Sequence, residues 1–312
     1  MKKRKIVVTG GAGFIGFHTV VALCSEGYQV MVVDDLRHAC GQKLPDEVEL
    51  VPLDIQSSDA YNQVVGFHPD AIIHLAAQGG VLRSLKEPTY DAGINVVGTV
   101  NMLKACVDSG CQRFVFASSG SVYGSCEGKP KDERSQPSPL SPYAASKVAG
   151  EAYLGMYSRT FGLKGIALRY ANVYGPFQDG TGEAGLVAIT CTRLLSGLPP
   201  RIFGDGNQTR DFVFVYDVVD ANLKSLNTNY IGAVNIATGV SHSVNDVVSE
   251  LARLHCYNGM LEFLEAKKGE VRHTMFKAER AKRVLGWQVR YQFAEGLKIT
   301  YESFKNLLMA GN

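Results

Sequence analysis

The sequence feature that most constrains the fold is a glycine-rich turn that joins an apolar run to a helical pattern. Residues 5–8 form a short, mostly apolar and β-branched run, which favours a buried strand. Residues 17–27 favour a helix whose carboxyl-terminal cap is a glycine. The turn between them reads Thr9-Gly10-Gly11-Ala12-Gly13-Phe14-Ile15-Gly16. The glycines are therefore expected where a strand turns directly into a helix.

Each glycine of this turn has its own role in binding a dinucleotide. Gly10 permits the tight bend, Gly13 lets backbone N–H groups approach a pyrophosphate, and Gly16 lets helix and strand pack closely. The helix N-terminus adds partial positive charge where the phosphates would lie. A second apolar run, residues 29–33, ends at Asp34, about 20 residues further on, where an acid binds both ribose hydroxyls and repels a 2′-phosphate. Glycines at this spacing also occur in other tight turns, but together with Asp34 they predict NAD in preference to NADP.

Length, charge and cysteine content narrow the class of protein. The chain has 312 residues, of which 46% are hydrophobic and 20% charged, as in ordinary globular proteins. A net charge of +2 gives no reason to expect nucleic acid or an anionic membrane as a partner. No apolar run approaches the ~18 residues of a membrane span. The seven cysteines are scattered without a Cys-x-x-Cys pair, which predicts reduced thiols, no metal site and a cytoplasmic location.

The first part of the chain, residues 1–175, alternates strands with helices. Strands are expected at about 5–9, 29–34, 48–52, 71–75, 113–118 and 164–169, with notable helices at 95–109 and 143–161. This alternation predicts an α/β fold, a Rossmann-type doubly wound parallel sheet with helices on both faces. Ligands of such sheets bind at the carboxyl ends of the strands. The residues expected there are Gly10, Asp34, Asp54, Ala76, Ala77, Ser119, Tyr170 and Asn172.

Residues 176–312 are expected to form a smaller α/β C-terminal region that binds the substrate, and the division leaves room for strands and helices to cross over between the two parts. Its helices are expected at about 183–196, 217–227, 243–255, 277–285 and 294–308. This region would cap the mouth of the sheet and form a cleft with it. The loop 124–142 contains four prolines and many polar residues, which predicts a mobile or lid-like connection.

A tyrosine and a lysine on one helix face form the second strong signal. Ser141 and Pro142 open a helix, so that Tyr143 and Lys147 lie one turn apart. An ammonium beside a phenol is expected to lower the phenol pKa, as a base working near neutral pH requires. Ser119, at the end of the fifth strand, would hydrogen-bond the same substrate oxygen. Each feature alone also fits an ordinary surface pair or a turn cap, but their combination with the glycine turn favours catalysis.

These motifs resemble those of the extended short-chain dehydrogenases/reductases in order and spacing. The shared motifs are the glycine turn, Val32-Val33-Asp34-Asp35, His74-Leu75-Ala76-Ala77, Ser118-Ser119, Tyr143-x-x-x-Lys147 and Arg169-Tyr170-Ala171-Asn172-Val173-Tyr174-Gly175. More narrowly, the chain resembles the NAD-dependent sugar-nucleotide 4-epimerases of the UDP-glucose/UDP-galactose type. The segments that carry this narrower resemblance are Gly182-Glu183-Ala184-Gly185, Phe203-Gly204-Asp205-Gly206, Arg210-Asp211-Phe212 and Gly269-Glu270-Val271-Arg272. The resemblance runs from about residue 5 to 300.

The resemblance implies a bound NAD, a UDP-sugar substrate and a role for each matching residue. Tyr143 would be the base, Lys147 would hold the nicotinamide ribose, and Ser119 would steer the sugar hydroxyl. The implied cofactor contacts are Gly10, Gly13, Phe14, Ile15, Gly16, Asp34, Asp54, Ile55, Leu75, Ala76, Ala77, Asn95, Ser118, Tyr143, Lys147 and Tyr170. The implied substrate contacts are Arg83, Ser84, Ser119, Ser121, Asn172, Leu186, Phe203, Arg210, Arg272 and Thr274. Two of these arginines suit a diphosphate because guanidinium groups form bidentate charge-assisted bonds.

The reaction implied is inversion at C4 through a 4-keto intermediate with tightly bound NAD. Related dehydratases carry an Asp-Glu pair where this chain has Gly120-Ser121, and decarboxylases usually carry Glu at the second of these positions, so both alternatives lose weight. A non-catalytic NAD-binding regulator is least favoured because both Tyr143 and Lys147 are present.

The identity of the sugar stays open at this point. Thr274 is small at a position where a bulky tyrosine excludes N-acetylated sugars, so UDP-N-acetylglucosamine is one alternative substrate. Arg83 is either a solvated loop charge or a partner for a C6 carboxylate, which would indicate UDP-glucuronate. Phe177 stands where several relatives have arginine, so a polar contact from that position is not expected. A homodimer is expected through the helices at 95–109 and 143–161, as is usual in the family.

Overall fold

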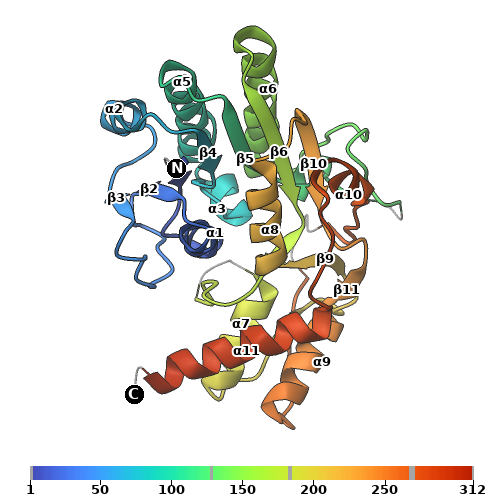
Figure 1. Ribbon diagram of the computed structural model, residues 1–312. Helices are drawn as coiled ribbons and strands as arrows, with labels where there is room; N and C mark the ends of the chain where they lie inside the picture. Colours follow the sequence, from blue (N-terminus) through green and yellow to red (C-terminus); the bar gives the residue numbers. More distant parts are fainter. Residues whose placement is uncertain (1–2, 127–128, 182–184, 267–270, 311–312) are drawn as a thin grey trace.

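The computed structural model describes residues 3–126, 129–181, 185–266 and 271–310. Seven parallel strands form its central sheet in the order β10-β6-β5-β4-β1-β2-β3 (Figure 1). The strands are β1 (Lys5–Thr9), β2 (Gln29–Val33), β3 (Glu49–Val51), β4 (Ala71–His74), β5 (Arg113–Ser119), β6 (Lys164–Tyr170) and β10 (Gly232–Ile236). This arrangement is the doubly wound Rossmann-type sheet predicted from the sequence.

Helices cover both faces of this sheet, and alternate residues of β1 show how the strand divides the core. Ile6 and Val8 pack with α1 (Phe14–Ser25) and α8 (Val215–Ser225) on one face. Val7 faces the opposite side, where the core includes residues of the remaining covering helices. Those helices are α2 (Ser58–Phe67), α5 (Thr99–Asp108) and α6 (Pro142–Phe161). Because both faces are covered, the strands are apolar on both sides, as the continuous runs in the sequence predicted.

The six strands expected before residue 175 are present within two residues of their expected bounds, but β10 was not expected. It starts at a glycine and has Asn235 between its apolar residues, so it lacks the long β-branched run of the other strands. It pairs with β6 at the edge of the sheet and brings the chain back from beyond residue 176. Helix α8 also lies beyond residue 176 and packs against α1 of the first part of the chain.

Local signals place α6 as predicted. The Ser141 hydroxyl accepts a hydrogen bond from the Ala144 N–H at 3.2 Å, Pro142 occupies the first turn, and Gly162 ends the helix at a φ of 70°.

The helix expected at 95–109 begins differently. A π-helical turn, η1 (Gly93–Gly98), precedes α5, and two short helices, α3 (Val81–Lys86) and α4 (Pro88–Ala92), lie before it.

The C-terminal part contains two small sheets and a helical layer. One sheet has the order β11-β9-β7 and the other pairs β12 with β8. Their strands are β7 (Asn172–Tyr174), β8 (Arg201–Phe203), β9 (Thr209–Phe214), β11 (Ser241–Ser243) and β12 (Glu262–Leu264). The helices are α7 (Leu186–Leu195), α9 (Val244–His255), α10 (Glu279–Leu285) and α11 (Phe293–Ala310), and α7, α9 and α11 lie beyond the sheet in Figure 1. The expected helices are all present, although residues 183–184 of the first lie outside the described residues.

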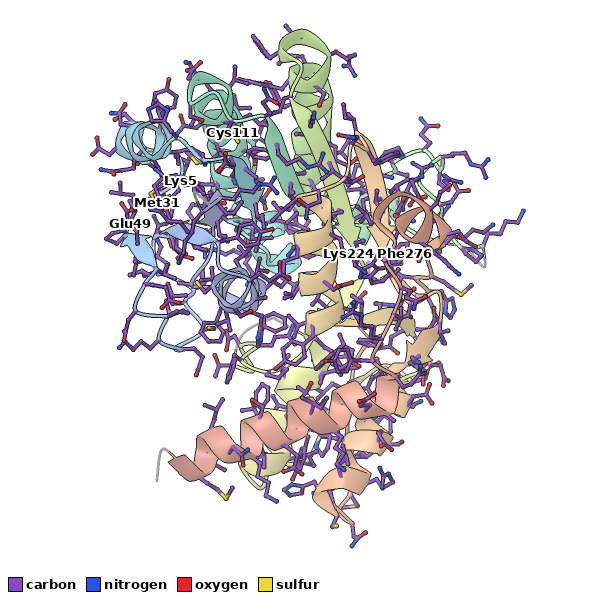
Figure 2. The ribbon with its side chains drawn as sticks, viewed as in Figure 1. Lys5, Met31, Glu49, Cys111, Lys224 and Phe276 are labelled. Atoms are coloured by element: carbon purple, nitrogen blue, oxygen red, sulfur yellow. The ribbon has the colours of Figure 1, made fainter. Side chains whose placement is uncertain are left out.

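The proline-rich loop 124–142 is fastened to the C-terminal part. The Lys131 N–H donates to the Met275 carbonyl at 3.0 Å, and the Lys131 carbonyl accepts from the Lys277 N–H at 2.9 Å. Phe276, labelled in Figure 2, packs on Tyr123 with ring centroids 5.7 Å apart. Described residues of this loop are therefore hydrogen-bonded to the C-terminal part of the chain.

Two further observations concern the whole chain. None of the helices in the described residues is both long and apolar enough to span a membrane. All seven cysteines lie in the described residues, and each is a free thiol.

Candidate active site

The glycine turn has the geometry that a dinucleotide requires. Gly10 has a φ of 70°, and a Cβ on it would lie 2.6 Å from the Ala76 nitrogen. A Cβ on Gly16 would lie 1.9 Å from the Gly10 carbonyl oxygen, so the packing of α1 on β1 demands glycine there. A Cβ on Gly13 would meet nothing closer than 3.4 Å. Packing within the chain therefore does not explain Gly13, whereas the approach of a pyrophosphate to the uncapped start of α1 does.

Asp34 is tied to this turn by backbone hydrogen bonds. It follows β2, is 8% exposed, and accepts hydrogen bonds from the Ala12 N–H at 2.9 Å and the Leu36 N–H at 2.8 Å. Burial raises the pKa of its carboxyl above the ordinary value, and these two donors oppose the rise. Each carboxylate oxygen keeps a second acceptor site, so the group fits two ribose hydroxyls.

The other predicted cofactor residues lie along the same edge of the sheet. Leu75, Ala76 and Ala77 follow β4, and the Leu75 N–H donates to the Thr9 carbonyl at 3.0 Å. Asp54 and Ile55 follow β3. The Asp54 carboxylate accepts a hydrogen bond from Arg37 at 2.9 Å. Phe14 and Ile15 open α1. The structure thus brings the residues predicted from four separate strands to one edge.

Tyr143, Ser119 and Lys147 meet at the end of β5. The Tyr143 side chain is partly exposed, and its phenol interacts with the Ser119 hydroxyl. The Lys147 ammonium lies 5.8 Å from the Tyr143 ring centroid and donates to the Ala117 carbonyl at 2.9 Å. The predicted triad is therefore assembled by the first two turns of α6 packing on β5.

The expected direction of the phenol pKa is wrong for the chain by itself. Burial raises the pKa of Tyr143, Ser119 opposes this rise through its hydrogen bond, and the charge of Asp91 adds to it. The Lys147 ammonium donates to the Ala117 carbonyl rather than to the phenol, and the residue is 3% exposed. Burial lowers the pKa of Lys147 to about 8, against the opposing charges of Asp91 and Glu151.

A second cluster of predicted residues lies on the small sheet beside this triad. Asn172 and Arg210 lie on the paired strands β7 and β9. The Arg210 guanidinium donates to the Thr209 and Arg272 carbonyls at 2.9 and 3.2 Å. Arg272 is exposed and pairs with Asp205 at 2.6 Å, which lowers the pKa of that carboxyl to about 2. The Arg210 guanidinium therefore lies against the backbone of Arg272, while the Arg272 guanidinium binds Asp205.

The hydroxyls of Ser121 and Thr274 are buried without a hydrogen-bond partner among the described residues. Ser121 follows β5 in the 3₁₀ turn η2 (Gly120–Tyr123), and the Thr274 N–H donates to the Thr209 carbonyl at 3.0 Å. Orphaned hydroxyls are rare inside proteins, and both positions were predicted to contact the sugar.

Several predicted contact residues direct their side chains elsewhere. The Ser118 hydroxyl donates to Glu151 at 2.5 Å, and the Tyr170 phenol donates to Asn222 at 2.6 Å. Ser84 is fully buried, and its hydroxyl donates to the Val81 carbonyl at 2.7 Å. Strand alternation explains Ser118, since its neighbour Ser119 points the opposite way. Asn95 holds Gln78 by two hydrogen bonds and also reaches Ser146.

The remaining predicted positions lie on three separate elements. Arg83 is on α3, where its guanidinium lies 4.4 Å from the Tyr90 ring centroid. Leu186 begins α7, and Phe203 ends β8. Residues 182–184 and 269–270 of the narrower motifs lie outside the described residues.

Phe177 packs against side chains of α1, in agreement with the expectation that it makes no polar contact. Its φ is 66°, and its ring stacks on His18 with centroids 5.4 Å apart and meets Phe17 at 5.5 Å. It lines an apolar hollow of about 460 Å³ between α1 and α8.

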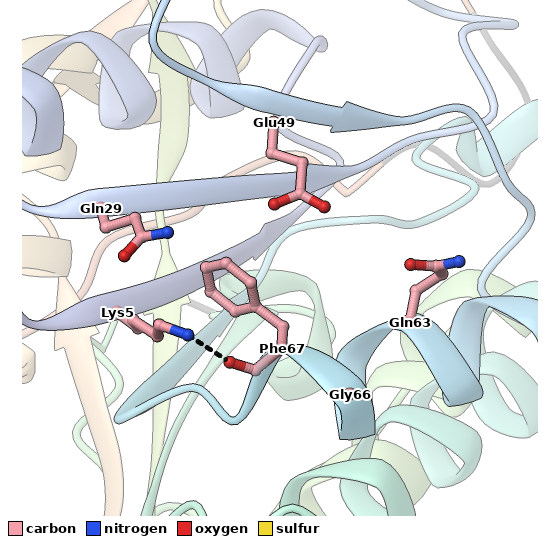
Figure 3. A pocket seen from close by; sticks show the side chains of 6 residues that line it. All are labelled: Lys5, Gln29, Glu49, Gln63, Gly66 and Phe67. Carbon is pink, nitrogen blue, oxygen red and sulfur yellow. Dashed lines mark hydrogen bonds between the residues drawn. The ribbon is translucent and has the colours of Figure 1, made fainter.

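A second cavity, of about 420 Å³, lies at the amino ends of the strands (Figure 3). Lys5, Gln29 and Glu49, the first residues of β1, β2 and β3, line it together with the end of α2. The Lys5 ammonium donates to the Phe67 carbonyl at 3.0 Å, as Figure 3 shows. Because parallel sheets bind ligands at the opposite edge, this cavity is not the candidate site.

Three residues near the triad were not predicted: Gln78 and Asp91, which are buried, and Glu151, which is partly buried. Glu151 lies one turn after Lys147, a spacing that was available as a signal. Asp91 lies four residues before Asn95, but the π-helical turn that brings them together has no sequence signature that we can identify.

Comparisons with known proteins agree with this arrangement. The NAD dependent epimerase/dehydratase family matches residues 6–237. A UDP-glucose 4-epimerase of Mycolicibacterium smegmatis is 42% identical over 309 residues, covering 97% of this chain and 99% of the relative. The crystal structure of a UDP-glucose 4-epimerase from Thermotoga maritima with UDP-glucose has a TM-score of 0.95 at 39% identity, with 97% and 99% of the two chains covered.

A further similar structure is that of Thermus thermophilus UDP-glucose 4-epimerase in complex with NAD, with a TM-score of 0.91 at 36% identity, covering 96% of this chain and 99% of that one. The family resemblance and the fold expected from the sequence are therefore confirmed. The chain belongs to the NAD dependent epimerase/dehydratase family.

Proposed function

We propose that this protein is an NAD-dependent epimerase that inverts C4 of a UDP-hexose, interconverting UDP-glucose and UDP-galactose through a 4-keto intermediate. The observation that carries the proposal is the meeting of Tyr143, Ser119 and Lys147 at the carboxyl end of β5. This triad lies on the same edge of the sheet as the glycine turn, so one bound NAD and one sugar can reach it together.

Within this function the chain positions the sugar and handles a proton. Tyr143 would take the proton of the sugar 4-hydroxyl, and Ser119 would hold the same oxygen through its hydroxyl. Bound NAD would supply the oxidant for C4 and place a positive ring charge near the phenol. Lys147 would hold the ribose hydroxyls with the ammonium protons that Ala117 leaves free. Burial of the site strengthens each of these electrostatic contacts.

The diphosphate would be bound at the rim by Arg210, Arg272 and Asn172. Arginine suits a diphosphate because its planar guanidinium donates two parallel hydrogen bonds. Arg272 would exchange its exposed partner Asp205 for phosphate oxygens. Leu186 and Phe203 would contact the uracil. Ser121 and Thr274, whose buried hydroxyls have no hydrogen-bond partner among the described residues, would bind the sugar.

The position after the catalytic serine disfavours a dehydratase. A Cβ on Gly120 would lie 2.4 Å from the Phe276 ring, so Phe276 leaves no room for an acidic side chain there.

UDP-N-acetylglucosamine and UDP-glucuronate stay as alternative substrates, the former because Thr274 is small and the latter because Arg83 carries a positive charge near the expected sugar position.

The test is sugar NMR on purified protein with each of three substrates in turn: UDP-glucose, UDP-N-acetylglucosamine and UDP-glucuronate. The proposal predicts that UDP-glucose gives UDP-galactose without net consumption of NAD. Faster turnover of either other sugar would move the assignment to that substrate. The proposal would be contradicted by release of water or carbon dioxide, or by a lack of turnover with every one of the three sugars.

We extend the proposal to a cytoplasmic homodimer. Free thiols at all seven cysteines suit a reducing compartment. The α6 surface supports association because Tyr153 and Phe161 are 40% and 54% exposed, and small Ala145 is also exposed. Sedimentation equilibrium at micromolar concentration should give twice the chain mass, whereas the single-chain mass would contradict the dimer.

A further inference from the structure

Asp91 is a buried carboxylate beside the catalytic helix with one oxygen unpaired. It lies on α4, is 1% exposed, and its Oδ1 accepts hydrogen bonds from Gln78 Nε2 at 2.8 Å and Asn95 Nδ2 at 3.0 Å. Its Oδ2 is buried without a hydrogen-bond partner among the described residues. Burying a charge in this way is costly unless a compensating charge lies nearby.

Backbone groups fix the orientation of both amides that bind Asp91. Asn95 Oδ1 accepts from the Gln78 backbone N–H at 2.9 Å, so Asn95 Nδ2 must face the carboxylate. Gln78 Oε1 accepts from the Gly80 backbone N–H at 2.5 Å, so its Nε2 must also face Asp91. Because a backbone N–H can only donate, neither amide can be reversed without losing a bond. The network therefore holds Asp91 in one orientation.

The buried charges around Lys147 balance only when Asp91 is counted. Glu151 is engaged by Arg169, which donates from Nε at 2.8 Å and from Nη2 at 2.6 Å. These two side chains are 13% and 6% exposed, so they form a closed buried pair. Lys147 and Asp91 then remain as one buried cation and one buried anion. The α6 helix that carries Lys147 packs against α4, which carries Asp91.

We propose that Asp91 is the counterion that keeps the Lys147 ammonium charged, a positioning residue set in place by the Gln78 and Asn95 amides. Other titratable groups also face the lysine. Tyr143 and Glu151 lie on the same helix, and His74 faces it from β4. His74 is neutral, and the Glu151 carboxylate forms an ion pair with Arg169. Asp91 is therefore the negative charge that, among the described residues, has no cation of its own. Burial lowers the pKa of Lys147 to about 8, and Asp91 opposes that shift more than Glu151 does.

Asp91→Asn removes the charge and keeps the hydrogen bonds. The Asn Oδ1 still accepts from both amides, and its NH₂ takes the place of the unpaired oxygen. The experiment is a pH titration of the holoenzyme labelled with ¹³C at the lysine ε-carbons, with the Lys147 signal assigned by its absence in Lys147→Arg. Burial should keep the wild-type midpoint below that of the exposed lysines. The Asp91→Asn midpoint should be lower by about half a pH unit or more, because removing the buried negative charge leaves the effect of burial on the ammonium less opposed.

Asp91→Glu restores the charge and should return the midpoint most of the way to wild type. Asp59→Asn removes one exposed acidic charge on α2 and should leave the midpoint unchanged. If Asp91→Asn does not fold, Asp91→Ser, which also accepts a hydrogen bond without a charge, takes its place with the same expected shift. A Lys147 midpoint in the neutral variant within about 0.3 units of wild type would overturn the proposal, since the charge of Asp91 would then have no effect on the lysine.

The inference rests on the proposed function only in its consequence for catalysis. The alkaline limb of kcat should move to lower pH in Asp91→Asn together with the NMR midpoint. The NMR titration reads the lysine directly, so a protein without epimerase activity would still show whether Asp91 is the counterion. The Lys147 midpoint could shift in Asp91→Asn while the alkaline limb of kcat stays where it is in wild type. That result would limit Asp91 to a structural role and contradict its role as a positioning residue.

Discussion

His74 at the end of β4 makes the stability of this protein depend on pH in a way that can be worked out from the structure. The ring is 1% exposed and lies against Phe114 and Phe116, with centroids 5.4 and 6.0 Å away. Burial and, to a smaller extent, the charge of Lys147 lower its pKa from 6.5 to about 3. The ring is therefore neutral in the folded protein at any pH at which the fold is stable.

Hydrogen bonds specify which neutral form is present. The Thr99 hydroxyl donates to the Asn95 carbonyl at 2.7 Å, so His74 Nε2 must donate to that hydroxyl at 3.0 Å. His74 Nδ1 then accepts from the Thr9 hydroxyl at 2.7 Å. A second proton on Nδ1 would face the proton of Thr9, which adds to the cost of burying the charge.

The unfolded chain takes up this proton below its ordinary pKa and the folded chain does not. The contribution to stability is therefore fully present above pH 6.5 and is lost as the pH falls towards 3. A difference of about 3.5 units at about 1.4 kcal/mol per unit sets an upper limit of about 5 kcal/mol. Between about pH 7 and pH 5 the linkage relation gives a loss of about 2 kcal/mol.

The assay is urea unfolding of wild type and His74→Gln at those two pH values, with NAD held at one saturating concentration. Trp287 is the single tryptophan and is 1% exposed, so its fluorescence reports on the core. The variant should be less stable than wild type at both pH values. Between pH 7 and pH 5, however, wild type should lose about 2 kcal/mol more of its free energy of unfolding than the variant does. Equal losses within about 0.5 kcal/mol would refute the reasoning, because that is the usual error of such differences.

Two further substitutions test the cofactor turn and the buried ion pair. Gly16→Ala places a Cβ 1.9 Å from the Gly10 carbonyl and should prevent correct folding, whereas Gly13→Ala should fold with normal circular dichroism but lose NAD on dialysis. Retention of NAD by Gly13→Ala at the wild-type level would contradict the pyrophosphate assignment. Glu151→Gln leaves the Arg169 charge buried without its partner and should cost about 3–5 kcal/mol in urea unfolding. A cost below about 1 kcal/mol would show that the pair is solvated like a surface ion pair.

Sequence patterns predicted the fold where local signals determine it. The glycine turn, the Ser141-Pro142 helix start and the β-branched strands each follow from a few neighbouring residues. The edge strand β10 was missed because its place in the sheet depends on pairing with β6 rather than on its own sequence. The same holds for η1, whose π-helical turn is fixed by the hydrogen bonds of Asn95.

The site shows the same division between local and long-range causes. Helical spacing predicted that Tyr143 and Lys147 share a face, and the structure agrees. The direction of the tyrosine pKa was wrong because it depends on burial and on Asp91, which belong to the tertiary structure. Ser118 was assigned to the cofactor from its motif, but its hydroxyl binds Glu151. Contacts between side chains of distant segments, such as Gln78 with Asp91, have no pattern in a single sequence.

The most direct test of the account is the rate of UDP-glucose epimerisation by Tyr143→Phe, measured by sugar NMR on protein whose bound NAD is quantified in the same sample. Phenylalanine keeps the ring and removes the hydroxyl that would take the sugar proton. The rate should be at least about 10²-fold below that of wild type, the usual contribution of a general base, with NAD content unchanged. A variant that retains NAD and epimerises UDP-glucose at close to the wild-type rate would contradict it.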